Sequence, residues 1–157
     1  MKKLTAFLLM LIPVTVALIG CSSEEGGPTG TAAEIADKIF EESGVDPFGM
    51  SDVIDTDDKL TYYLGSTNYS SVSDAAVVLP MISLDTRALY VIKAENGASV
   101  DDIRTQLDED IDPQRLICVS FTMEDVVIES RGDVIFMTIN SNVEQRDALV
   151  TAFAAIQ

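Results

Sequence analysis

Two short runs of this sequence carry apolar residues on both sides of an extended chain, and they limit the folds open to it. Residues 134–139 (VIFMTI) and 89–92 (LYVI) are rich in β-branched and aromatic side chains, which is typical of β-strands. Successive side chains of a strand point to opposite faces of its sheet, so both faces are apolar here. We expect either that a helix covers the second face or that an apolar surface awaits a partner. We favour internal cover by the first helix.

The predicted strands form two hairpins. Residues 76–79 and 89–92 are separated by polar turn residues. Residues 125–130 and 134–140 meet across a short turn in the same way. Because Pro80 cannot donate a hydrogen bond to a sheet ladder, we expect the first strand to lie at a sheet edge or to be bulged there.

Helices are predicted before, between and after the hairpins. Thr31 and Glu34 have the spacing of a capping box, so a helix should begin at Thr31, and Gly44 suits its end. A second helix is predicted after Ser99 and a last one over residues 143–156, each with apolar residues three and four apart. The predicted buried positions of the three helices are Ile35, Ala36, Ile39 and Phe40, then Val100, Ile103, Leu107 and Ile111, then Leu149, Phe153 and Ile156.

The order helix, hairpin, helix, hairpin, helix predicts an α+β fold. We expect a two-layer sandwich in which helices pack on an antiparallel sheet of about four strands. Two hairpin–helix units and the N-terminal helix would build it, as a single globular domain over residues 31–157. A short helix is predicted around residues 57–64, whereas residues 116–121 fit either a helix or a strand.

The N-terminus has a different character. Lys2 and Lys3 precede an uncharged run over residues 4–19, which is shorter than the ~20 apolar residues of a comfortable membrane span. Gly20 and Cys21 follow directly. In this order the segment resembles the signal peptide and lipobox of bacterial lipoproteins. The alternative is a transmembrane anchor with a Cys at its end by chance.

The lipobox resemblance implies a covalent anchor and a location. The implied processing is cleavage after Gly20, a diacylglyceryl thioether on Cys21, and fatty acylation, such as palmitate, of the new N-terminus. Residues 1–20 would be the signal peptide, and residues 21–30, which are polar and Gly-rich, a lipidated flexible tether. The protein would then lie on the extracytoplasmic face of the cell membrane, in the cell envelope.

The net charge of the chain limits the classes of partner that it can bind. The 157 residues include 26 acidic and 10 basic side chains, a net charge of -16. Loss of residues 1–20 removes two of the basic residues and none of the acidic ones, which leaves a net charge of -18. A body this acidic has no basic patch for nucleic acid and is repelled by anionic headgroups, so the lipid must hold it to the membrane.

Residues from about Ala32 to Phe153 also resemble a known family. The residues that carry the resemblance are EIADKI over residues 34–39, LPM over 79–81, YVIK over 90–93 with the helix over 99–107, and GDVI over 132–135. The chain is similar to a family of small bacterial lipoproteins known only as domain-of-unknown-function family 4358. This resemblance implies the lipoprotein address and a compact fold, and it brings no activity.

The chain contains no His, which removes the usual general base, the common nucleophile pairs and the commonest zinc ligand. We expect no enzyme and no cofactor, but a non-catalytic binding or accessory module whose partner is an envelope protein or peptide. One alternative is a hydrolase of cell-wall glycans that uses paired carboxylates. It would need a carboxyl group with a raised pKa, because 26 acids place some pair close together in any case.

A second alternative is a calcium-responsive structural lipoprotein. Residues 108–112 (DEDID) have the alternate acids of a calcium loop, but Pro113 and Val119 stand where such a loop needs Gly and Glu. A helix cap is the simpler explanation of this run. The other acidic cluster, which a solvated loop would explain, consists of Asp52, Asp55, Asp57 and Asp58.

Three further features have a structural and a functional explanation. Tyr62, Tyr63 and Tyr69 could stack on sugars, although tyrosines at a core edge are commoner. The tripeptide over residues 131–133 (RGD) matches an integrin-binding motif, and Gly at a hairpin tip already explains it. Cys118 lies in an apolar string without basic neighbours, so we expect a buried structural thiol and no disulfide.

Overall fold

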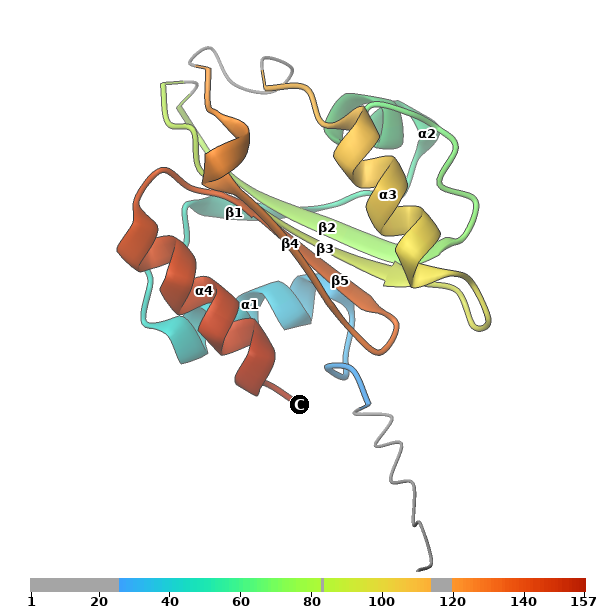
Figure 1. The fold of residues 1–157 in the computed structure, drawn as a ribbon, viewed down its shortest axis with the longest axis horizontal. Helices are drawn as coiled ribbons and strands as arrows, with labels where there is room; N and C mark the ends of the chain where they lie inside the picture. Colours follow the sequence, from blue (N-terminus) through green and yellow to red (C-terminus); the bar gives the residue numbers. More distant parts are fainter. Residues whose placement is uncertain (1–25, 83, 114–119) are drawn as a thin grey trace, which may run out of the picture.

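The computed structural model describes residues 26–82, 84–113 and 120–157 (Figure 1). Its helices and strands are α1 (Ala32–Ser43), β1 (Gly49–Val53), α2 (Asp57–Lys59), η1 (Leu60–Leu64), β2 (Val72–Pro80), β3 (Ala88–Ala94), α3 (Val100–Asp110), η2 (Met123–Asp125), β4 (Val126–Arg131), β5 (Val134–Ile139) and α4 (Val143–Ala155). The strands form one antiparallel sheet in the order β1-β2-β3-β5-β4. The predicted α+β class is confirmed, with five strands in place of about four. No helix in the described ranges is long and apolar enough to cross a membrane.

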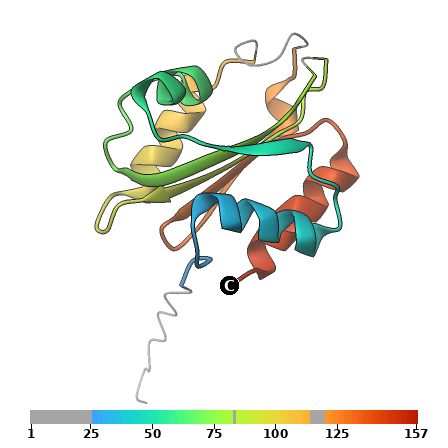
Figure 2. The same cartoon turned by 180° about the vertical axis from the view of Figure 1, so that it is seen from behind.

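Helices cover the sheet on both faces (Figures 1 and 2). On one face α1 and α4 pack against alternate residues of the central strands, such as Val91 and Phe136. On the other face α3 and η1 pack against the intervening residues, such as Tyr90 and Ile135. All six residues of β5 are buried as a result. Internal cover of the apolar strands is confirmed: α1 and α4 cover one face, and α3 and η1 cover the other.

The edge position predicted for the first strand of hairpin one is wrong. That strand is β2, and it lies between β1 and β3. Pro80 is its last residue, opposite Gly49 of β1 and beyond Val78, the last residue of β2 with a partner in β3. The missing N–H of Pro80 therefore interrupts no pairing with β3, and the irregularity of β2 lies instead between Val72 and Asp74.

The predicted helix ends agree with the structure. Thr31 and Glu34 form the reciprocal capping box of α1, and Gly44 ends this helix in the left-handed conformation with a φ of 66°. Ser99 caps α3 and Asn142 caps α4 through their side chains. The short helix predicted around residues 57–64 is the continuous α2–η1 segment. Of residues 116–121, only 120 and 121 are described, and they lie in neither a helix nor a strand.

Residues 26–30, the second half of the predicted tether, lie against the domain beside the β4–β5 turn (Figure 2). Pro28 is buried. Lys38 donates to the carbonyl oxygen of Thr29 at 2.9 Å, and Lys93 donates to that of Gly30 at 2.6 Å. The first half of the predicted tether, residues 21–25, lies outside the described residues.

Candidate functional site

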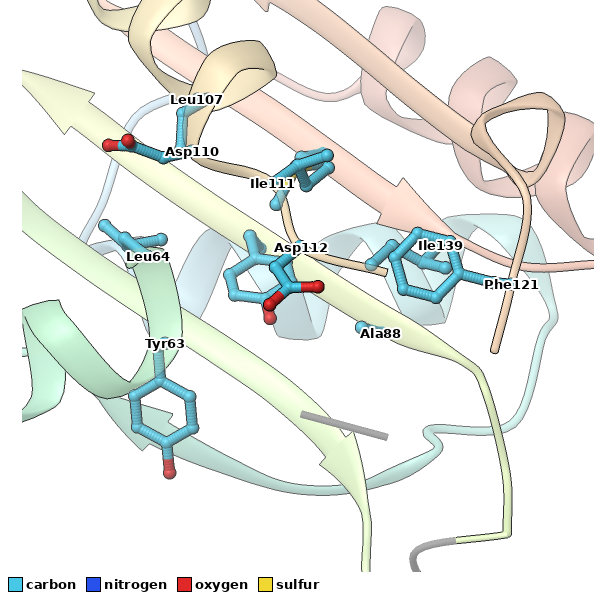
Figure 3. A pocket seen from close by; sticks show the side chains of 11 residues that line it. Tyr63, Leu64, Ala88, Leu107, Asp110, Ile111, Asp112, Phe121 and Ile139 are labelled. Carbon is cyan, nitrogen blue, oxygen red and sulfur yellow. The ribbon is translucent and has the colours of Figure 1, made fainter. Parts of the chain in front are cut away.

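An apolar cavity lies between the sheet and the layer formed by η1 and α3 (Figure 3). Ala88 of β3, Leu107 of α3 and Ile139 of β5 are among its lining residues. The cavity has a volume of about 30 Å³, which is room for one or two water molecules. Sites for small molecules usually measure roughly 300–1,000 Å³. The cavity is therefore about a tenth of the usual minimum volume of a small-molecule site or less.

Asp110, at the rim of this cavity, joins two distant segments. The hydroxyl of the buried Tyr69 is 3.1 Å from Asp110 Oδ2 and 3.5 Å from the carbonyl oxygen of Leu64. Gln106 Nε2 lies 3.5 Å from the same carboxylate oxygen. Asp108, two residues earlier, lines a different groove, on the β4 side of α3. Acids of the 108–112 run thus line different hollows, and no group of three Cys, Asp or Glu in the described part of the chain could hold a metal ion.

The second acidic cluster is organised around Lys59. The Lys59 ammonium lies 2.9 Å from Asp52 and 3.1 Å from Asp55, and the Tyr63 hydroxyl donates to Asp52 at 2.7 Å. Hydrogen bonds from Lys59 and Tyr63 lower the pKa of the Asp52 carboxyl. Burial, followed by the hydrogen bond to Asp52, raises the pKa of Tyr63 to about 12. Asp52 and Asp55 thus have a basic partner within the chain, which explains their part of the cluster without a metal.

The three tyrosines do not form one stacking surface. Tyr69 is buried, Tyr63 is bonded to Asp52, and Tyr62 is 58% exposed with its ring edge-on to that of Tyr63. The RGD tripeptide is a hairpin tip. The Arg131 guanidinium donates to the carbonyl oxygens of Phe153 at 2.8 Å and Ile156 at 2.7 Å, at the end of α4. Neither feature presents the arrangement that sugar or integrin binding would need.

Three carboxyl groups in the described part of the chain have shifted pKa values, and all three shifts are downward. The pKa of Glu34 is lowered by hydrogen bonds from Thr31, that of Asp85 by hydrogen bonds from Arg87, and that of Asp52 as described above. A general acid in a glycoside hydrolase needs the opposite shift.

An open hollow lies between α3 and the edge strand β4, with a volume of about 630 Å³. We call it the α3–β4 groove. Its residues are Asp101, Arg104, Thr105 and Asp108 of α3, Met123 of η2, and Val126 and Ile128 of β4. Arg104 crosses it and donates to the carbonyl oxygen of Ile128 at 3.2 Å. This groove could not be predicted from the sequence, because the order of strands in a sheet decides which strand lies at an edge. The spacing of Asp101, Thr105 and Asp108 along one helix side was its only signal.

Cys21 and Cys118 both lie outside the described residues, so lipid attachment and a buried thiol remain predictions. A scan of protein-family models found no match to the chain, and searches of curated proteins and of solved structures found none either. The resemblance to family 4358 likewise remains a prediction.

Proposed function

We propose that this protein is a membrane-anchored extracytoplasmic lipoprotein, held by lipid on Cys21, whose domain is a non-catalytic binding or accessory module. One observation carries the proposal: a short basic start, an uncharged run over residues 4–19, Gly20 and Cys21 follow one another in the order of a lipoprotein signal peptide.

The lipid supplies the attachment that the protein surface cannot. Each buried methylene contributes about 0.8 kcal/mol, so one acyl chain binds marginally and two or three bind durably. A mature chain with 8 basic and 26 acidic residues is repelled by anionic lipid. The five peptide steps from Cys21 to Gly26 span at most ~18 Å, so the domain would stay close to the bilayer.

A binding role is supported by the surface of the domain. The cavity beside Asp110 has room for one or two water molecules, whereas the α3–β4 groove is open and lies along a sheet edge that has no strand partner among the described residues. The carboxyl groups with shifted pKa values are stabilised in their charged form, which suits recognition more than proton transfer.

The test is metabolic labelling with an alkyne fatty acid in wild type, Cys21→Ser and the matched control Cys118→Ser. Wild type and Cys118→Ser should be labelled and processed to the shorter mature chain. Cys21→Ser should be unlabelled and keep its leader. Because an uncleaved leader can itself hold a chain in the membrane, labelling and length decide the result. A labelled, normally processed Cys21→Ser variant would refute the anchor.

A further inference from the structure

The outer edge of β4 has no strand partner in the described part of the chain. In an antiparallel pair, alternate residues bond to the neighbouring strand and the residues between them point their backbone groups away. The Ile128 carbonyl accepts from Arg104 on the outer side, so Ile128, and with it Val126 and Ser130, belongs to the outward set. The two-residue turn closes with Arg131 opposite Val134, and such a turn is flanked by a hydrogen-bonded pair. Arg131 and every second residue before it therefore bond to β5, which leaves Ser130, Ile128 and Val126 pointing outward.

The side chains beside this edge are apolar on β4 and acidic on the facing flank of α3. Val126 and Ile128 pack on the face of the sheet that α3 covers. Asp101 and Asp108, both exposed, stand two helical turns apart on the flank of α3, a separation of roughly 10 Å. Alternate residues of a strand lie about 7 Å apart, so an extended segment can bring a cation to each acid.

The guanidinium group of Arg104, which lies in the groove, is only partly hydrogen-bonded. One guanidinium nitrogen donates to Ile128, while Nε is buried and has no hydrogen-bond partner among the described residues. An incoming strand would bond the Ile128 carbonyl through its own N–H and would displace Arg104 from it. In the unbound protein, Arg104 thus takes the hydrogen bond at Ile128 that an added strand would make.

We propose that the α3–β4 groove binds an extended cationic segment of another polypeptide, which adds to the sheet along β4. Backbone hydrogen bonds to Ile128 and Ser130 align the segment. Its Lys or Arg side chains lay their aliphatic stems on Val126 and Ile128 and place their charges against Asp101 and Asp108. This inference rests on the proposed binding function and names its partner chemistry. A second copy of the chain fits less well, because two strongly acidic bodies repel each other.

The test measures a labelled peptide of alternating Lys and Val binding to the full chain in mild detergent, by fluorescence anisotropy at low salt. Asp101→Asn with Asp108→Asn should weaken binding about three- to tenfold. The matched control is Asp102→Asn with Glu109→Gln, which makes the same charge change at exposed positions in the same two turns of α3, away from the groove. It should change binding by less than about twofold. Arg104→Ala, which vacates the edge and removes a like charge, should strengthen binding.

Backbone pairing has its own probe. The same peptide carrying N-methyl groups on alternate residues keeps every charge but loses donors to β4, and it should lose most of its affinity. Equal weakening by both double variants, or undiminished binding of the methylated peptide, would overturn the proposal in favour of general charge attraction. So would dimerisation through β4 in sedimentation, which would make a second copy the occupant. The fatty-acid labelling of Cys21 is independent of all these outcomes, so failure of the groove and failure of the anchor are distinguishable.

Discussion

Gly132 occupies a conformation and a contact that both require glycine. Its φ is 57°, and a Cβ at this position would lie 2.5 Å from the backbone nitrogen of Gly27. Gly44 has a similar φ of 66° but faces open space. We expect Gly44→Ala to lower the free energy of unfolding by about 1–2 kcal/mol. Gly132→Ala should cost at least about 1 kcal/mol more, because the segment over residues 26–30 must move. Urea unfolding measures both, and equal losses would contradict the docking of this segment.

Asp52 should contribute to stability in a pH-dependent way. Hydrogen bonds from Lys59 and Tyr63 hold the pKa of its carboxyl below the usual value of 3.8. A lowered pKa in the fold means that the contribution is present above the unfolded-state pKa and is lost as pH falls through the folded-state value. Asp52→Asn should therefore show a shallower fall of unfolding free energy below about pH 4 than wild type. The difference should be small, because the Asp52 side chain is 44% exposed.

The control for this titration is Asp58→Asn, an exposed acid in the same region. It should keep the wild-type slope in urea unfolding over the same pH series. If Asp52→Asn also keeps that slope, the bonds to Lys59 and Tyr63 do not stabilise the fold.

Contacts between segments far apart in the sequence could not be predicted. Tyr69 and Asp110 are 41 residues apart, and Arg104 and Ile128 are 24 apart. Composition and local spacing identify clusters of like residues, but only the folded chain decides which member meets a partner. Local backbone chemistry was predictable, as the hairpin tip at Gly132 shows.

The helix α1 begins at a reciprocal capping box, which is a local sequence signal. Thr31 accepts from the backbone N–H of Glu34, and the Glu34 carboxylate accepts from that of Thr31. Thr31→Ala should lower the free energy of unfolding by about 1 kcal/mol, because an N-terminal donor of the helix loses its acceptor. Thr31→Ser, which keeps the hydroxyl, should lose less than half as much in urea unfolding. Equal losses would mean that the methyl group of Thr31, and not its cap, is what matters.

Helices and central strands were predictable because their patterns are strong, and β1 was not because its pattern is weak. Every residue of β1 is exposed or half-buried, so it shows no apolar alternation. It forms through pairing with β2, which no local signal reports. The face that each helix covers is likewise set by the sheet order, in which β5 separates β3 from β4. Among the described strands, that order places β4 at the edge of the sheet, beside α3.

For the domain as a whole, the proposed anchor on Cys21 implies an orientation. The segment before α1 lies beside the β4–β5 turn, at the end of the sheet away from the β2–β3 connection (Figures 1 and 2). If lipid holds Cys21, a fluorophore on Asp133 in that turn should be quenched more by headgroup-attached quenchers than one on Leu84 in the connection. The comparison is made in lipid vesicles. Each variant keeps the lipidated Cys21, has Cys118 replaced, and carries one introduced cysteine for the fluorophore. Equal quenching would contradict a fixed orientation.

The anchor itself can be read directly from the wild-type protein. Intact-mass and N-terminal peptide analysis of the chain extracted from membranes should show that residues 1–20 are absent and that Cys21 carries a diacylglyceryl group. A chain that still begins at Met1, or one cut elsewhere with an unmodified Cys21 thiol, would contradict the lipoprotein account.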